Sequence, residues 1–355
     1  RAGLEALAES RLSVNRALVA RVAVGRPGED RELARVAAEG WDLLCELDRT
    51  HGRAVREVLA HPYVQAWATR CLRPAPSSRA DLDRAHLAGL AAAVALRAET
   101  AVELALPVRD GLLHLPTLGA LRTGDAGTAV RVRITPDGIA AEHGGVWQPT
   151  RRIVAGGLAL VLEDLDPFRG GGHRPVTGRL SSAGWRSWRS VLDAGARDLK
   201  TRLPSYADVL GRAAGSIVPL AGEPGGMSLP DAYGAVAAGL PPGPDELAEV
   251  LLGEFQSTKL NGITDLHDLY DPGRPLRPAG GDGPRPVADV LRGAYRSLAL
   301  GELWRSRRDL ERFRHHRTVV ERGLDALLEP GVLTGDGRIF AEGMVTTRDR
   351  WARTD

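Results

Sequence analysis

Apolar residues recur with helical spacing through the first hundred residues of the chain. Their positions at residues 4–22, 33–47 and 55–72 match one face of a helix in each case. A Pro/Ser-rich stretch at 74–78 interrupts this pattern. We expect Asp81 to cap the next helix, which is rich in alanine and extends to about residue 101.

Between residues 102 and 166 the pattern changes to the alternation of β-strands. Residues 130–134 alternate between apolar side chains and arginine, and 158–162 form a short apolar run typical of a buried strand. The segments 113–119 and 164–169 have the composition of structured exits from strands. This part of the chain is therefore predicted to be a β-rich insert.

Helical patterns return after a glycine-rich loop at 170–172. Strands are predicted at 217–220 and 233–237, followed by a helix across 246–260 with Asp245 as its N-cap. Further helices are expected beyond residue 287. The predicted fold class is α+β and predominantly helical.

The expected organisation has three regions along the chain. Residues 1–101 form an N-terminal helical region, 102–169 form the β-rich insert, and 170–355 form a C-terminal helical region that we expect to be one compact unit. At 355 residues and 43% hydrophobic content, the chain can bury a large core.

Composition excludes several classes of partner. The net charge is only +2, and no basic stripe with interleaved aromatic residues favours nucleic acid. No apolar run reaches the roughly 18 residues of a membrane span. The two cysteines, Cys45 and Cys71, are expected to be reduced and to lie in helices. These features predict a cytoplasmic protein that binds neither nucleic acid nor membrane.

Two segments, at residues 228–235 and 245–260, resemble a known family. In that family a serine-rich turn and a Gly-Ala strand precede a helix that reads roughly His-Glu-Phe-Gln-His-Ser-Lys-Leu. The matching residues are Leu251, Glu254, Phe255, Gln256, Lys259 and Leu260. On these residues the chain resembles the HExxH-type peptide β-hydroxylases, which the resemblance implies to be iron- and 2-oxoglutarate-dependent enzymes of ribosomally synthesised peptide (RiPP) maturation. Members fused to FxSxx-type radical SAM peptide cyclases also resemble residues 61–67 and 115–119.

The chain departs from this family at the metal ligands. The two histidines of HExxH are one helical turn apart and face one metal, but Gly253 and Ser257 stand there. Glycine has no donor, and a neutral serine hydroxyl is a poor metal ligand. A Trp-Arg pair of the family is replaced by Gly280 and Gly281, which removes an arginine suited to a dicarboxylate. The resemblance thus implies a zincin-like strand-helix unit in a pseudoenzyme, without bound iron or 2-oxoglutarate.

The resemblance also implies where a peptide would bind. The strand before the metal helix borders the cleft in such architectures and offers its main chain to an extended peptide. The groove candidates are Ser228, Asp231, Tyr233, Gly234 and Ala235, and the alternative is a plain edge strand. Further cleft candidates are Gln256, Lys259, Asp282, Arg285, Arg292 and Tyr295.

Three functions follow as hypotheses. The first is a peptide-binding or accessory domain of RiPP maturation, with a precursor peptide as partner and a radical SAM enzyme fused or associated. Glu254 is then only a vestige of the catalytic residue. The second is an active hydroxylase with a metal site rebuilt from Asp265, His267, Asp268 or Asp271. The third is a structural interaction domain of a radical SAM enzyme.

Overall fold

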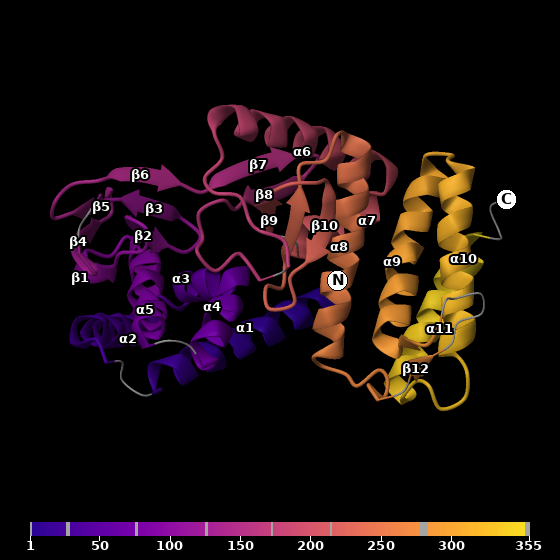
Figure 1. Ribbon diagram of the computed structural model, residues 1–355, viewed down its shortest axis with the longest axis horizontal. Coiled ribbons are helices and arrows are strands. Elements are labelled where there is room, and N and C mark those ends of the chain that lie inside the picture. The colour runs from indigo at the N-terminus through magenta and orange to yellow at the C-terminus, as the bar shows by residue number, and fades with distance from the viewer. Residues whose placement is uncertain are drawn as a thin grey trace. The chain divides into compact units, whose positions relative to one another are not determined.

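The chain forms two compact units in the computed structural model (Figure 1). The structure describes residues 2–25, 29–74, 77–124, 127–171, 173–213, 215–273, 275–276 and 283–351. The first unit contains Arg1–Arg152 and Val161–Leu180, and the second contains Ile153–Leu160 and Ser181–Asp355. Helix covers 56% of the chain and strand 18%, which confirms the predicted α+β, mostly helical fold class. In the described segments, no helix is both long and apolar enough to cross a bilayer.

Helices make up the N-terminal part of the first unit. They are α1 (Ala2–Ala23), α2 (Arg31–Thr50), α3 (Gly52–Leu59), α4 (Pro62–Leu72) and α5 (Ser77–Arg97). Asp30 caps α2 by accepting hydrogen bonds from the amides of Glu32 and Leu33. The prediction for Asp81 is wrong, because this residue lies inside α5. Its carboxylate accepts a hydrogen bond from the Asp30 amide at 2.8 Å, so its role is to fix the start of α2.

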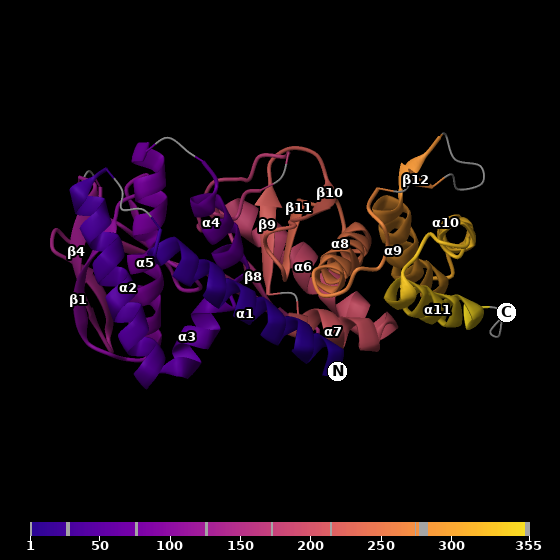
Figure 2. The same cartoon turned by 90° about the horizontal axis from the view of Figure 1, so that it is seen from below.

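Short antiparallel sheets complete the first unit. One has the order β1 (Val102–Pro107), β4 (Ala129–Thr135), β5 (Gly138–Ala141), and the other β2 (Leu112–Leu115), β3 (Gly119–Arg122), β6 (Val146–Pro149). In β4, Val130, Val132 and Ile134 are buried while the arginines between them are exposed. This alternation turns one face of the sheet towards α2 and α5, which lie beside β1 and β4 (Figure 2).

The second unit is built on a mixed sheet. Its order is β10 (Gly225–Ser228), β11 (Ala235–Gly239), β9 (Ser216–Leu220), β8 (Leu158–Leu162), β7 (Arg151–Ala155). The pair β9–β11 is parallel, and β10 runs antiparallel to β11 at the edge. The sequence predicted β9 and β8 but read residues 225–228 as a turn. The predicted strand at 233–237 is shifted by two residues.

Helices complete the second unit. They are α6 (Ser182–Arg202), α7 (Pro204–Ala213), α8 (Pro244–Thr264), α9 (Val287–Ser306), α10 (Leu310–Leu327) and α11 (Gly335–Asp349), with a small ladder of β12 (Pro275–Leu276) and β13 (Arg285–Pro286). Helix α8 contacts β10, β11, α6 and α9, so it is buried almost all round. It begins at Pro244 after Gly243, and Asp245 lies in its first turn. The predicted N-cap at Asp245 is therefore wrong by two residues.

The two units cut across the three regions expected from the sequence. The hairpin of β7 and β8 belongs to the predicted β-rich insert, yet Ile153–Leu160 falls in the second unit. Residues after β8, up to Leu180, return to the first unit. The prediction that residues 170–355 form one unit by themselves stays a prediction.

Candidate functional site

Helix α8 carries the segment that resembles the HExxH motif. Its central turns, from Leu247 to Leu260, pack against both the sheet and α9, and this places Glu254 and Ser257 in the interior of the second unit. Glu254 is only 3% exposed to solvent. A buried carboxylate needs a partner, because removing its charge from water is costly.

Arg296 of α9 supplies that partner. Its Nη1 donates to Oε1 of Glu254 at 2.5 Å, across 42 residues of sequence. The same guanidinium lies directly beside Gly253, where an added β-carbon would lie 2.6 Å from Arg296 Nε and 2.9 Å from its Cζ. The space for the first motif side chain is therefore filled by an arginine.

The second motif position is also closed. The Ser257 hydroxyl donates to the carbonyl of Gly253 at 3.2 Å, which turns it back onto its own helix. Iron requires several imidazole or carboxylate donors around one point. Here the protein's own cation stands beside the only carboxylate of the motif, so the residues of this segment do not fit an iron ion.

The groove candidates divide between an edge strand and the strand beside it. Ala235 is the first residue of β11, which pairs with β9 on one side and β10 on the other. Ala235 itself is buried, pairs with Ser216 of β9, and donates its amide to the carbonyl of Ala232, so its place in a groove stays a prediction. Gly234 is left-handed (φ 87°), and its carbonyl accepts from the amides of Gly215 and Ser216. Asp231 and Tyr233 lie with it in the turn between β10 and β11.

Strand β10 is the edge of the sheet nearest the motif. A β-carbon on Gly226 would lie 2.7 Å from Cγ of Glu254. Only glycine therefore allows the strand to approach the helix so closely. Ser228 ends this strand and is half-buried. Of the predicted groove residues, Ser228 is the one that the structure places on an edge strand.

Two of the cleft candidates meet each other. Lys259 Nζ lies 5.3 Å from the centre of the Tyr295 ring, which itself packs against Phe340. Burial lowers the pKa of Lys259 and raises that of Tyr295. Gln256 is buried with its Oε1 lacking a hydrogen-bond partner.

The remaining cleft candidates do not join this pair. Arg292 forms an ion pair with Asp289 on its own helix, at 3.3 Å. Arg285 is exposed in β13, which directly precedes α9. Asp282 lies outside the described residues, as do Gly280 and Gly281.

Residues of the acidic turn after α8 make contacts within the protein. His267 Nδ1 contacts Asp336 Oδ2 at 2.9 Å on the surface, Asp271 accepts from the Gly273 amide, and the carbonyl of Asp268 accepts from a threonine. Across the part of the chain that the structure describes, no group of His, Cys, Asp and Glu is arranged to hold a metal. A metal site rebuilt from Asp265, His267, Asp268 or Asp271 stays a hypothesis.

Sequence reasoning missed a second buried polar cluster, in the first unit. His61 stands at the N-cap of α4, where its side chain makes no capping bond. Its Nε2 lies 3.4 Å from Oδ2 of Asp166, which follows β8, and both side chains are nearly inaccessible, at 7% and 6% exposure. This separation is long for a hydrogen bond, and among the described residues the buried Nε2 has no hydrogen-bond partner.

Glu163 accompanies Asp166 in this cluster. Oε1 of Glu163 accepts from the amides of Leu165 and Asp166, while Oδ1 of Asp166 accepts from the Phe168 amide. Burial and the nearby charge of Asp166 raise the pKa of Glu163. Burial would also raise the pKa of Asp166, but contact with the His61 imidazole outweighs it and lowers that pKa. The two carboxyl groups are thus driven apart in acidity.

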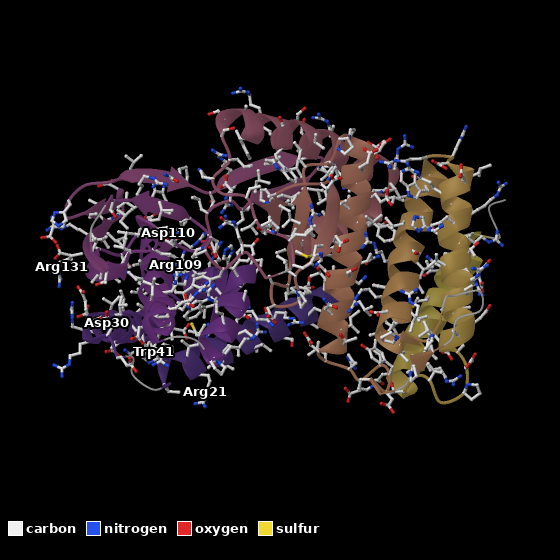
Figure 3. The ribbon with its side chains drawn as sticks, viewed as in Figure 1. Arg21, Asp30, Trp41, Arg109, Asp110 and Arg131 are labelled. Carbon is white, nitrogen blue, oxygen red and sulfur yellow. The ribbon has the colours of Figure 1, made fainter. Side chains whose placement is uncertain are left out.

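More imidazoles lie around these acids. Burial lowers the pKa of His86 to about 3 and that of His114 to about 4, so both rings are neutral at pH 7. His86 packs against Phe168, whose ring also contacts Arg109 (labelled in Figure 3). Nδ1 of His114 is also buried, and it has no hydrogen-bond partner in the part of the chain that the structure describes.

A small cavity adjoins the cluster. It has room for roughly one water-sized group. Its polar walls come from His114, Thr117, Thr150, Glu163 and Asp166. Thr117 has a left-handed backbone (φ 72°), which a β-branched residue rarely adopts, and its hydroxyl accepts two hydrogen bonds from Arg97.

The sequence held a partial signal for this cluster. The segments 113–119 and 164–169 were both recognisable as structured exits from strands, and the structure brings them to one cavity. No local sequence pattern indicated that His61, at the start of α4, would contact Asp166.

Neither a protein-family model nor a curated protein sequence matches the chain.

Proposed function

We propose that this chain is a peptide-binding or accessory protein of RiPP maturation, built on the scaffold of an HExxH-type peptide β-hydroxylase whose metal site has been replaced by an arginine. The observation that carries the proposal is the position of Arg296, ion-paired with Glu254 and packed against Gly253. Glu254 then serves structure, and no iron or 2-oxoglutarate is needed.

An arginine is a reasonable substitute for a metal in a scaffold that must stay folded. Loss of a bound cation would leave Glu254 as an uncompensated buried charge, which destabilises a protein by about 3–5 kcal/mol. The Arg296 guanidinium provides a permanent positive charge at that point. This supports a pseudoenzyme in which α8 remains as a support for the strand beside it.

Edge strand β10 supports the peptide-binding part of the proposal. A strand at the edge of a sheet can pair with an extended peptide through main-chain hydrogen bonds, and these survive loss of the metal. The partner under this proposal is a precursor peptide, delivered by or shared with a radical SAM enzyme that is fused or associated. The setting would be the cytoplasm.

The first experiment tests the loss of metal. The protein is purified after expression with added iron and assayed for bound metal and for succinate formation from 2-oxoglutarate. The proposal expects substoichiometric iron and no succinate above a blank. Stoichiometric iron with succinate formation would overturn it in favour of the active hydroxylase.

The second experiment tests the peptide groove. Random dodecapeptides displayed on phage are selected on the protein, and the best binder is studied by calorimetry and hydrogen–deuterium exchange. The expected result is slower exchange at Gly225–Ser228, with no change at β7, the opposite edge of the same sheet. Absence of any binder, or protection confined to other segments, would leave the purely structural interaction domain as the better description.

A further inference from the structure

Glu163 and Asp166 differ from two other buried acids of the first unit, Asp164 and Asp83, in how they are neutralised. Asp164 Oδ2 lies 3.1 Å from Arg151, and its Oδ1 is paired with Arg179 at 2.5 Å. Asp83 is held between Arg70 and Arg109. Among the described residues, by contrast, no arginine or lysine side chain forms an ion pair with Glu163 or Asp166. Their cavity therefore has an excess of acceptors and of potential negative charge.

The acceptors around the cavity are of a specific kind. Glu163 and Asp166 each use one carboxylate oxygen for backbone amides. The second oxygen of Asp166 faces His61 Nε2 at 3.4 Å, which is long for a hydrogen bond, so it can still accept one. His114 is neutral at pH 7, because burial lowers its pKa to about 4, and its buried Nδ1 has no hydrogen-bond partner. A neutral imidazole can accept one hydrogen bond through its unprotonated nitrogen.

Size and charge narrow the class of ligand. An anion would face two carboxyl groups, and a bulky cation would not enter a space for roughly one water-sized group. A metal would need ligands that converge, and within the described ranges no such group occurs. An ammonium group is small, positively charged and carries three donors with no acceptor.

We propose that the cavity beside β2 and β8 binds a primary ammonium group, with Glu163, Asp166 and His114 as its acceptors. Its three N–H groups match these three side chains, and its charge compensates a carboxyl pair that, in the described part of the chain, has His61 beside Asp166 but no arginine or lysine ion pair. Thr117 and Thr150 line another part of the cavity. The left-handed Thr117, fixed by Arg97, shapes this wall.

The source of the ammonium group is either a free small amine or the amino end of a peptide. Both present the same head group, and the site recognises that group. The inference does not rest on the proposed function, because it concerns other residues in the other unit. The test of this inference follows NMR signals of imidazoles in the first unit, whereas the test of the peptide groove follows hydrogen exchange at β10. One proposal can therefore fail while the other holds.

The test uses methylammonium chloride as the probe, with tetramethylammonium chloride at the same concentration as a control that has no N–H donor. Imidazole nitrogen signals of His61 and His114 are followed by NMR in the full chain. A saturable shift with methylammonium and none with tetramethylammonium is expected. Equal responses to both salts, or no saturable response, would overturn the proposal. A stoichiometric response to zinc chloride at these signals would replace it with a metal site.

Two variants locate the binding. Glu163→Gln keeps a carbonyl oxygen for the amides of Leu165 and Asp166 but removes the negative charge, and should weaken methylammonium binding at least tenfold. Glu103→Gln alters an exposed carboxylate of β1 that is paired with Arg133, and should leave binding unchanged. Equal loss in both variants would contradict the assignment. Circular dichroism confirms that each variant is folded.

A last comparison distinguishes the sources. Triglycine with a free amino end, its N-acetylated form, and the amide of Nα-acetyllysine are titrated in the same way. A shift with triglycine alone supports a peptide amino end, and a shift with the lysine derivative supports a side-chain amine. A shift with the acetylated triglycine would overturn recognition of an amine.

Discussion

Glu254 in the second unit and the Glu163–Asp166 pair in the first unit are buried carboxylates with different surroundings. In the second unit Glu254 is paired with Arg296, and the guanidinium also fills the space beside Gly253. In the first unit Glu163 and Asp166 adjoin a cavity, and Asp166 has His61 at 3.4 Å as its partner in the described ion pairs. The segment with a familiar motif is therefore closed, while the cluster without one has room and free acceptors. Likeness to a motif does not reveal whether a site is still open.

The largest effect should follow from restoring the first motif histidine. In Gly253→His the new side chain must displace Arg296, which leaves Glu254 buried without its partner. We expect the free energy of unfolding to fall by about 3–5 kcal/mol, measured by urea denaturation.

A double variant shows whether this loss arises from Arg296. In Gly253→His with Arg296→Ala the collision is absent, so the combined loss should be smaller than the sum of the single losses by at least about 1 kcal/mol. Strict additivity would mean that Arg296 does not occupy the position of the histidine.

A smaller effect is expected from Arg296→Ala alone. Because the Arg296 side chain is itself 34% exposed, water can partly replace it beside Glu254, so the cost should lie below that of a fully buried pair, at about 2–3 kcal/mol in unfolding free energy. Arg292→Ala, one turn earlier on α9, removes an exposed pair with Asp289 and should cost less than about 0.5 kcal/mol. Similar losses in the two variants, again from urea denaturation, would remove the distinction between a closed ionic site and an ordinary surface pair.

The smallest effect concerns pH and the open cluster. Burial lowers the pKa of His114 from 6.5 to about 4, so the unfolded chain takes up a proton on acidification before the folded one does. Stability from this group is complete above pH 6.5 and is lost as the pH falls towards 4. Between pH 7 and 5 the loss should be about 2 kcal/mol.

The comparison that isolates this effect is wild type against His114→Gln. Glu163, whose pKa is raised, acts in the opposite direction, but it is present in both proteins. The glutamine variant should lose about 2 kcal/mol less than wild type on going from pH 7 to pH 5, measured by urea denaturation at each pH. An identical pH dependence would show that His114 takes up protons equally easily in the folded and unfolded chain.

The elements of the fold were predictable wherever the pattern was local. The alternation in β4 and the apolar run of β8 gave their strands correctly, because each reports burial within a few residues. Strand β10 was missed, since Gly225 and Gly226 read as a turn, and its presence moved β11 away from the edge of the sheet. The glycine at 226 reflects contact with Glu254, which no local pattern reveals.

The candidate site was predictable only in part for the same reason. Gly253 and Ser257 identified the turn of α8 that lacks metal ligands, but Arg296 comes from another helix, and its pairing with Glu254 depends on how the helices pack. In the same way, the contact of His61 with Asp166 is between the N-cap residue of a helix and the loop after β8. Such pairs are set by the tertiary fold, and a single sequence gives no spacing from which to infer them.

The hairpin of β7 and β8 has a consequence for how the protein is made. Because Ile153–Leu160 belongs to the second unit and Val161–Leu180 to the first, neither unit is complete as one uninterrupted stretch of chain. During synthesis, Asp166 is added about a hundred residues after His61, which takes roughly 5–20 seconds at the usual rate of translation. The sheet of the second unit likewise gains its first strands before the helices that cover it exist. If the chain were divided after Leu180, β7 and β8 would remain with the N-terminal part although they belong to the sheet of the second unit. The two units therefore cannot be exchanged between proteins as separate modules by a single cut at this point.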